Sequence, residues 1–193
     1  MITGVVLAAG EARRFGATKQ IAMLQGKALA QHAIDTLAEA GADEILVITG
    51  HDADAVESAL RMPASGRFVR NGAYRDGQST SLAAAFHEVA GDSEASVVLM
   101  ADQPGITADD VRALVQRFRA TRSQIVRLRF DDGPGPALLS REIYAEAGHL
   151  HGDVGARVLI ASHPEWVEEV VIARPAPVDI DAPADLGYSS TVD

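Results

Sequence analysis

The chain has 193 residues, of which 47% are hydrophobic and 23% charged, a length and composition suited to one globular domain with a buried core. Its formal charge of -10 at pH 7 argues against binding to a nucleic-acid backbone, and its apolar stretches are too short to cross a membrane. The lack of cysteine excludes disulfide and thiolate chemistry, and no secretory signal follows Met1, so we expect a cytoplasmic protein.

Short apolar runs alternate along the chain with segments of helical periodicity. Strands are expected at residues 2–9, 44–50, 67–70, 97–101, 125–130 and 137–139. Helices are expected at residues 29–40, 54–60, 81–89, 141–147 and 155–162, and from Thr107 onward. This alternation predicts an α/β three-layer sandwich, in which a mostly parallel sheet carries helices on both faces. No domain boundary is evident, so residues 1–193 are expected to form a single domain.

The loop after the first expected strand combines small and cationic residues. Ala8, Ala9 and Gly10 allow a ligand to approach the backbone and leave N–H groups available to donate. Arg14 and Lys19 then supply a planar guanidinium fork and a mobile ammonium group for phosphate oxygens. Because ligands bind at the carboxyl ends of strands in such sheets, this loop predicts a site for a triphosphate.

Two common phosphate-binding loops are excluded by spacing. Five residues separate Gly10 from Gly16, where the Walker pattern needs four, and Ala12 occupies the second glycine position of the dinucleotide pattern. Arg13 and Lys27 extend the cationic stretch around this loop. A locally cationic pocket on an acidic chain suits a small anionic ligand better than a polymer.

The run resembles the signature of the MobA-like nucleotidyltransferases, L-A-[AG]-G-x-x-x-R-x-G-x-x-K. The matching residues are Leu7, Ala8, Ala9, Gly10, Arg14, Gly16 and Lys19. Ala12 stands where Ser or Gly is frequent and Phe15 where Met is frequent, but neither change removes a phosphate-binding group. The resemblance implies a Rossmann-like nucleotidyltransferase fold, with the nucleotide bound by about residues 1–104 and the acceptor by about residues 105–186.

Two further segments resemble the same family. Asn71 and residues 77–82 are similar to its segment that closes over the nucleotide base, where Gly77 allows close approach and Ser81 can offer a hydroxyl to a base edge. Asp102, at the end of an apolar strand, looks like the metal-binding position of this family, since a carboxylate facing phosphates can hold Mg²⁺. For Ser81 and Asp102 a capping role is the alternative. The resemblance thus implies nucleotide binding by Leu7, Ala8, Ala9, Gly10, Arg14, Lys19, Asn71, Gly77 and Ser81, and catalysis by Arg14, Lys19 and Asp102.

Residues 135–141 and 150–157 resemble blocks found more narrowly in the molybdenum cofactor cytidylyltransferase branch. Asp153 is the candidate for a second metal contact or an acceptor contact, with an N-cap of the following helix as the alternative. Arg157 could meet an acceptor phosphate or pair with an acid on its own helix.

Two other features are assigned no part in catalysis. Residues 179–186 resemble the family's closing D-I-D-T-P-x-D-L and are interpreted as mainly structural. His149 and His151 are interpreted as solvated residues rather than zinc ligands.

The resemblance favours CTP as the nucleotide and molybdopterin, or its Mo-bound form, as the acceptor. The cytidylyl branch carries Ala-Ala-Gly where the guanylyl branch carries Ala-Gly-Gly, and the methyl group of Ala9 could narrow the pocket beside the base. Transfer of CMP to the terminal phosphate would release pyrophosphate and yield a cytosine dinucleotide cofactor for a molybdoenzyme.

Other functions stay open at this point. Related families transfer nucleotides to sugar phosphates, and a close branch includes a nicotine-blue oxidoreductase that would use NAD(P)H. A third interpretation is a non-catalytic nucleotide-binding module, against which the presence of both Lys19 and Asp102 argues.

Overall fold

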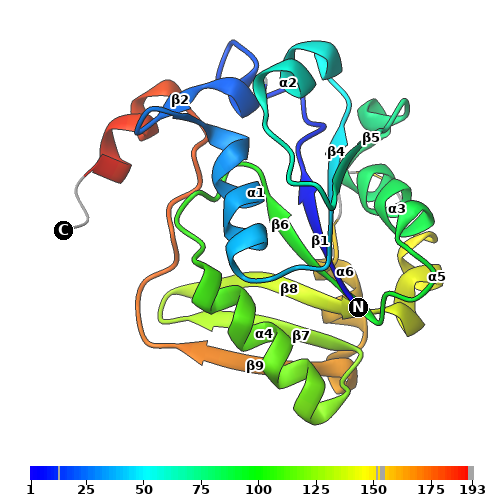
Figure 1. The fold of residues 1–193 in the computed structure, drawn as a ribbon. Coiled ribbons are helices and arrows are strands. Elements are labelled where there is room, and N and C mark those ends of the chain that lie inside the picture. The colour runs from blue at the N-terminus through cyan, green and yellow to red at the C-terminus, as the bar shows by residue number, and fades with distance from the viewer. Residues whose placement is uncertain (13, 151, 153–154, 191–193) are drawn as a thin grey trace.

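The computed structural model describes residues 1–12, 14–150, 152 and 155–190, and within them a seven-stranded sheet is flanked by helices (Figure 1). The strands of this sheet are β1 (Ile2–Leu7), β4 (Glu44–Thr49), β5 (Gly66–Arg70), β6 (Ala95–Met100), β7 (Ile125–Phe130), β8 (Gly133–Ser140) and β9 (Val167–Ile172). The α-helices are α1 (Leu29–Glu39), α2 (Ala53–Ala59), α3 (Gln78–Glu88), α4 (Ala108–Thr121), α5 (Tyr144–Ala147) and α6 (Arg157–Ser162). Apart from the sheet lies a small hairpin of β2 (Met23–Leu24) and β3 (Lys27–Ala28). None of the helices in the described ranges has the length and apolar character needed to span a membrane.

The order of strands places β1 at a reversal point of the sheet. The strands lie in the order β5-β4-β1-β6-β8-β7-β9, and neighbours are parallel except at β8, which is antiparallel to β6 and β7. The chain therefore moves from β1 to β4 and β5 on one side, then returns to β6 on the other. In open sheets of this kind the crevice at the reversal point binds ligands at the carboxyl ends of the strands. Residues that follow β1 and β6 occupy this position.

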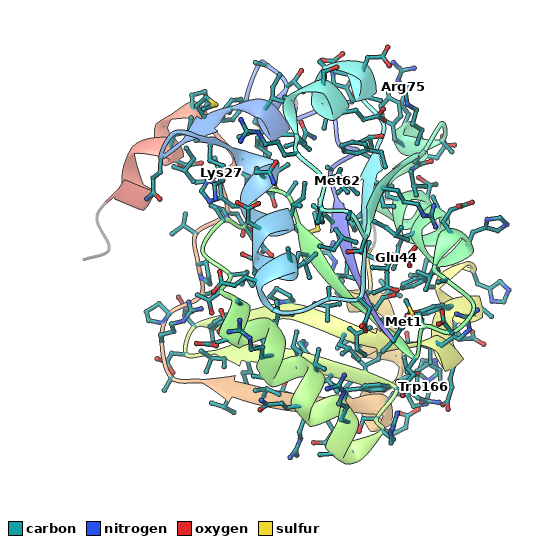
Figure 2. The ribbon with its side chains drawn as sticks, in the orientation of Figure 1. Met1, Lys27, Glu44, Met62, Arg75 and Trp166 are labelled. Carbon is teal, nitrogen blue, oxygen red and sulfur yellow. The ribbon has the colours of Figure 1, made fainter. Side chains whose placement is uncertain are left out.

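Each face of the sheet is covered by helices that bury a separate apolar core. On one face α1 and α4 contribute the fully buried Leu37 and Leu114, and on the other α3 contributes Leu82. Side chains fill the space between the sheet and these helices (Figure 2). Val6 of β1 belongs to the first core and Val5 to the second, which explains why this central strand is apolar throughout.

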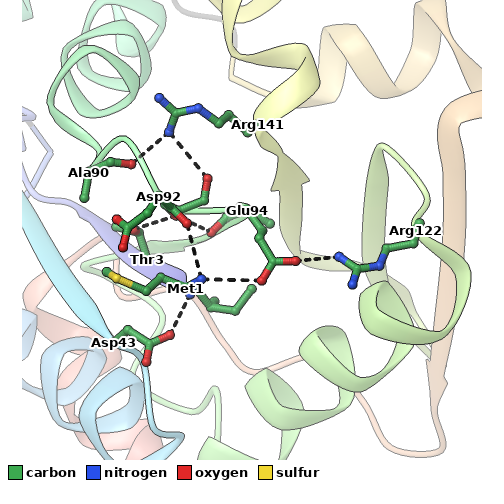
Figure 3. Close-up of polar contacts among 11 residues, drawn as sticks. Met1, Thr3, Asp43, Ala90, Asp92, Glu94, Arg122 and Arg141 are labelled. Atoms are coloured by element: carbon green, nitrogen blue, oxygen red, sulfur yellow. Dashed lines mark hydrogen bonds and ion pairs between the residues drawn. The ribbon is translucent and has the colours of Figure 1, made fainter.

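Polar contacts close the amino-terminal edge of the sheet, opposite the ligand edge (Figure 3). The ammonium group of Met1 lies 3.4 Å from a carboxylate oxygen of Glu94, and Glu94 also pairs with Arg122. The backbone N–H of Ile2 donates to Oδ2 of Asp43 at 2.7 Å. These contacts tie β1 to the elements on both sides of it.

Residues 173–182, here called the C-terminal strap, lead from β9 to the ligand edge without regular secondary structure (Figure 1). Near its start, Arg174 pairs with the buried carboxylate of Asp110 in α4. Near its end, the backbone N–H of the fully buried Ile180 donates to the carbonyl of Asp102 at 2.9 Å. The strap is therefore held at both ends and lies beside the last residues of β6.

The predicted α/β three-layer sandwich with a mostly parallel sheet is confirmed, and β7 and α1 lie within a residue of their expected positions. The sequence pattern does not predict β9, because Glu168 and Glu169 interrupt its apolar residues. In the structure Glu168 pairs with Arg117 at 2.6 Å and Glu169 pairs with Arg127. Charges paired in this way are compatible with an edge strand.

The start of α4 yields a stability prediction. Thr107 Oγ1 accepts a hydrogen bond from the Asp110 N–H at 3.2 Å, and Asp110 Oδ2 accepts one from the Thr107 N–H at 2.9 Å. Thr107→Ala should lower the free energy of unfolding by about 1 kcal/mol, measured by urea denaturation, because one capping bond is lost. Gln116→Ala, on the exposed side of the same helix, is the control and should change stability little. Equal losses in both variants would contradict the capping role.

Candidate active site

Two adjoining cavities lie at the carboxyl ends of β1 and β6. The larger has a volume of about 610 Å³ and extends between the loop after β1 and residues 74–81. The smaller, about 110 Å³, is lined by Lys19 and Asp102 among others. Both cavities are lined by Leu7, Gly10, Ala12 and Met100. Together they form one elongated site at the strand-reversal point, a common location for small-molecule sites.

The loop after β1 presents open backbone to these cavities. A side chain built on Gly10 would meet nothing within 4 Å, and the Gly10 carbonyl accepts a hydrogen bond from Gln20 Nε2 at 2.8 Å. The N–H groups of Ala9 and Gly10 donate to none of the described residues, which leaves them available to a ligand. Ala12 has a φ of 47°, in the left-handed region that favours glycine. This conformation explains why glycine is frequent at that position of the signature.

Lys19 joins the first loop to two carboxylates from distant parts of the chain. Its ammonium nitrogen lies 2.8 Å from Oδ2 of Asp102 and 3.2 Å from Oδ1 of Asp181. Partial burial lowers the pKa of Lys19, but hydrogen bonds and charge attraction from the two carboxylates outweigh it and raise the pKa above its usual value. At the smaller cavity, the Lys19 ammonium group is therefore protonated and held between the carboxylates of Asp102 and Asp181.

A third acid, Asp179, adds to this cluster. Its Oδ1 accepts a hydrogen bond from Gln103 Nε2 at 2.9 Å. Although Asp179 as a residue is exposed, partial withdrawal of its carboxyl from water raises the pKa, and the negative charges of Asp102 and Asp181 raise it further. Across the described ranges, no three acidic or histidine side chains lie close enough to form a metal site by themselves. A cation here would need oxygen atoms from a ligand or from water to complete its coordination.

The segment from Asn71 to Ser81 forms a wall of the larger cavity. Gly77, with φ 110° and ψ 171°, turns the chain into α3 through a conformation that favours glycine. Asn71 is buried, and its Nδ2 donates to Thr80 Oγ1 at 2.8 Å and Ser81 Oγ at 3.0 Å, while its Oδ1 accepts from the Ala73 N–H. The buried Asn71 therefore holds this wall in place through its hydrogen bonds, without lining the cavity itself.

The structure brings most of the sequence-predicted residues to one place. The larger cavity is lined by Leu7, Ala9, Gly10, Gly77 and Ser81, and the smaller by Leu7, Gly10, Lys19 and Asp102. Ala8 and Asn71 are buried and line neither cavity, while Arg14 is exposed and also lines neither. Three residues named in the sequence analysis, Arg13, His151 and Asp153, lie outside the described residues. The carbonyl of Gly152 accepts a hydrogen bond from the Ser79 N–H at 3.2 Å, so Gly152 meets the start of α3.

Sequence analysis does not identify several residues at or beside this site. Among them are Gln20, Tyr74, Asp179 and Asp181. The interpretation of residues 179–186 as mainly structural is incomplete, because only the central Ile180 is buried while Asp181 binds Lys19. The sequence signal that could have indicated this is the Asp-Ile-Asp pattern at residues 179–181. An apolar residue between two acids is typical of a segment that buries one side chain and leaves its neighbours exposed.

Residues 4–167 match the family model of the MobA-like NTP transferase domain. The chain belongs to this family. Nicotine blue oxidoreductase from Paenarthrobacter nicotinovorans is 27% identical over 183 residues, 88% of this chain and 86% of that protein. The bifunctional protein GlmU from Methylibium petroleiphilum is 33% identical over 148 residues, 74% of this chain but 32% of that longer protein.

A solved structure extends the likeness to the whole chain. The manganese complex of Rv0371C from Mycobacterium tuberculosis H37Rv has 28% identity and a TM-score of 0.83, covering 99% of each chain. The MobA-like family and the Rossmann-like nucleotidyltransferase fold that the sequence signature implied are thereby confirmed.

Asp179 yields a prediction on pH dependence. Because its pKa is raised in the folded protein, its stabilising contribution is present at low pH and is lost as the pH rises through that pKa. Asp179→Asn keeps the acceptor for Gln103 without the charge, so its urea midpoint should exceed that of the parent at pH 7. The gain should shrink as the pH falls toward about 4, the usual carboxyl range.

The control for simple charge removal is Asp92→Asn on the exposed surface at the opposite edge of the sheet. A midpoint for Asp179→Asn below that of the parent at pH 7 would show that the carboxylate is net stabilising there, contrary to this account.

Proposed function

We propose that this protein is a Mg²⁺-dependent nucleotidyltransferase that transfers CMP from CTP to the terminal phosphate of a small acceptor, with molybdopterin as the favoured acceptor. The observation that carries the proposal is the group formed by Lys19, Asp102 and Asp181 beside the open backbone of Gly10. Cationic, anionic and N–H groups meet there at the end of a cavity large enough for a nucleoside. Membership of the MobA-like family supports the same class of reaction.

The carboxylates at and beside the smaller cavity fit a hard divalent cation. Asp102 and Asp181 offer carboxylate oxygens, and Asp179 lies near enough for its charge to interact with both. Mg²⁺ is usually bound by one or two carboxylates together with phosphates and water, which agrees with the absence of a complete protein-only site among the described residues. When bound, the cation would neutralise charge on the triphosphate oxygens. The manganese complex of the Mycobacterium tuberculosis relative supports this choice of site class.

Phosphates are assigned to the loop after β1. The N–H groups of Ala9 and Gly10 can donate to phosphate oxygens, and Lys19 can supply its positive charge from the other side. Arg14, exposed at the turn that follows, is assigned to the outer phosphates. This division leaves the larger cavity, lined by Gly77 and Ser81, for the nucleoside.

The reaction then requires positioning rather than proton transfer. A terminal phosphate oxygen of the acceptor forms a bond to the α-phosphorus of CTP, and the bond from that phosphorus to the bridging oxygen breaks as pyrophosphate leaves in line. The attacking oxygen is already ionised at neutral pH, so no general base is needed. Histidine and cysteine are absent from the described residues that line the two cavities, which agrees with this mechanism.

The acceptor is assigned to the far half of the chain. Asp153 stays a candidate for acceptor or metal contact, supported by the packing of Gly152 and Gly155 against Ser79 and Gln78 at the start of α3. Arg157, exposed at the start of α6, is the second candidate for an acceptor phosphate.

A second candidate function is reduction of a small molecule by NAD(P)H. The likeness to nicotine blue oxidoreductase over 86% of that protein's length favours it. The ion group at Lys19 argues for the transferase instead, since hydride transfer needs no pair of carboxylates around a lysine.

Pyrophosphate release tests the proposal. With Mg²⁺ and a phosphorylated pterin acceptor, we expect release from CTP in preference to GTP, ATP or UTP. Asp102→Asn should lower the rate by about 100-fold or more while circular dichroism stays unchanged, because an electrostatic group at the reacting centre is lost. Asp35→Asn, which removes an acid paired with Lys27 outside both cavities, is the matched control. Oxidation of NADPH without pyrophosphate release would instead establish the second candidate.

A further inference from the structure

Gly50 lies against two residues that line the larger cavity, Ala9 and Tyr74. Gly50 follows β4, and a Cβ atom built on it would lie 2.8 Å from Cβ and Cγ of Tyr74 and 2.9 Å from Cβ of Ala9. The φ of Gly50 is not in the left-handed region, so its backbone does not require glycine. Glycine is needed here for space: it lets the Tyr74 side chain and the Ala9 methyl approach one another.

The backbone that carries Tyr74 is held in place. The preceding Ala73 donates its N–H to Asn71 Oδ1 at 2.9 Å and accepts a hydrogen bond from Thr80 Oγ1 at 3.0 Å. The Tyr74 carbonyl accepts from the Gly77 N–H, closing the turn before α3. The Cα–Cβ bond of Tyr74 therefore has little freedom to move away from Gly50.

The ring of Tyr74 is also flanked on its outer side. The guanidinium carbon of Arg75 lies 5.2 Å from the ring centroid, and Arg75 Nε lies 3.2 Å from Oε1 of Glu11 in the first loop. The His51 ring lies 6.1 Å away at a tilted angle. In Figure 2 Arg75 is at the outer rim of the molecule, far from Trp166 at the opposite end. This ion pair links the two walls of the larger cavity over the tyrosine.

Tyr74 is the single aromatic residue among the described residues that line the larger cavity. Nucleobases bind to proteins largely by stacking on aromatic side chains, an interaction that depends on where the ring is held. We propose that Tyr74 is the base-stacking, specificity-determining residue, and that Gly50 is a positioning residue that seats its ring against Ala9. The inference rests on the proposed function, since it assigns the nucleoside to this cavity.

This arrangement changes how Ala9 would select the base. Ala9 lines the cavity but is only 4% exposed, and its methyl group faces Gly50. The sequence-based expectation is that this methyl group narrows the pocket beside the base. In the proposed arrangement the methyl also limits how far the Tyr74 side chain can approach, so the depth of the base pocket depends on Ala9 and Tyr74 together.

Binding of CTP and of inorganic tripolyphosphate, each with Mg²⁺, separates the base from the phosphates. Gly50→Ala should displace Tyr74 and weaken CTP about tenfold, while tripolyphosphate binding changes less than about twofold, as measured by isothermal titration calorimetry. Tyr74→Leu, which keeps bulk but not the aromatic face, should show the same pattern, and Tyr74→Phe should bind CTP like the parent. Gly72→Ala is the matched control, because a Cβ there meets nothing within 4 Å.

A combined variant tests whether Gly50 acts through the Tyr74 ring. With Tyr74→Gly and Ala9→Gly together as background, the three nearest atoms that a Cβ on Gly50 would meet are gone. Adding Gly50→Ala to this background should therefore cause no further loss of CTP affinity. A further loss, or a loss of tripolyphosphate binding, would overturn the positioning role. CTP binding that is equal in the parent, Gly50→Ala and Tyr74→Leu would overturn the inference alone. A parent protein that binds neither probe would overturn the proposed function as well.

Discussion

The ammonium group of Lys19 holds together three parts of the chain that are far apart in sequence. Its partners are Asp102, 83 residues away at the end of β6, and Asp181, 162 residues away at the end of the strap. The Lys19 side chain is only 12% exposed, so water and salt screen these attractions less than those of a surface ion pair. Without this cation the acids of β6 and the strap would face one another at short range. The geometry of the site therefore depends on one positive charge among carboxylates.

This arrangement reconciles an acidic chain with an anionic ligand. A formal charge of -10 should repel a triphosphate at long range. At short range, however, the ammonium group of Lys19 and the open N–H groups of the first loop can donate to an anion within the crevice. A divalent cation bound at Asp102 would add to this, and the acids that repel a free nucleotide would then bind its metal complex. If the proposed function is correct, the same cluster would discriminate between a nucleotide and its metal-bound form.

Features with a strong local pattern could be predicted from the sequence. Leu37 and its neighbours at helical spacing, followed by Gly41 with a φ of 84°, mark α1 and its end. The first loop can be recognised because its small and cationic residues lie within a few positions of one another. The contact between Asp181 and Lys19 could not be predicted, because it depends on the path of the strap along the whole sheet. The same holds for Gly50 and Tyr74, which follow two strands that pair with each other, β4 and β5.

The strap shows how tertiary contacts give a role to a segment with little pattern of its own. Ile180 is buried and hydrogen-bonded to the chain at the end of β6, which places an acid on each side of it at the ligand edge. The pairing of Arg174 with Asp110 fixes the other end, next to the cap of α4. The contacts that hold the strap, outside the cavities, thus determine which carboxylates lie beside Lys19.

The most direct test of this account is the affinity for CTP measured by calorimetry with and without Mn²⁺, in the parent and in Lys19→Ala. The account predicts that Mn²⁺ strengthens CTP binding to the parent, and that Lys19→Ala weakens it by about 1.5–3 kcal/mol, as for a lost charge-assisted hydrogen bond. Lys27→Ala, which removes an equal charge paired with Asp35 outside both cavities, should bind CTP like the parent. Equal affinity of the parent for CTP and for cytidine, unaffected by Mn²⁺, would contradict a metal–triphosphate site at Lys19.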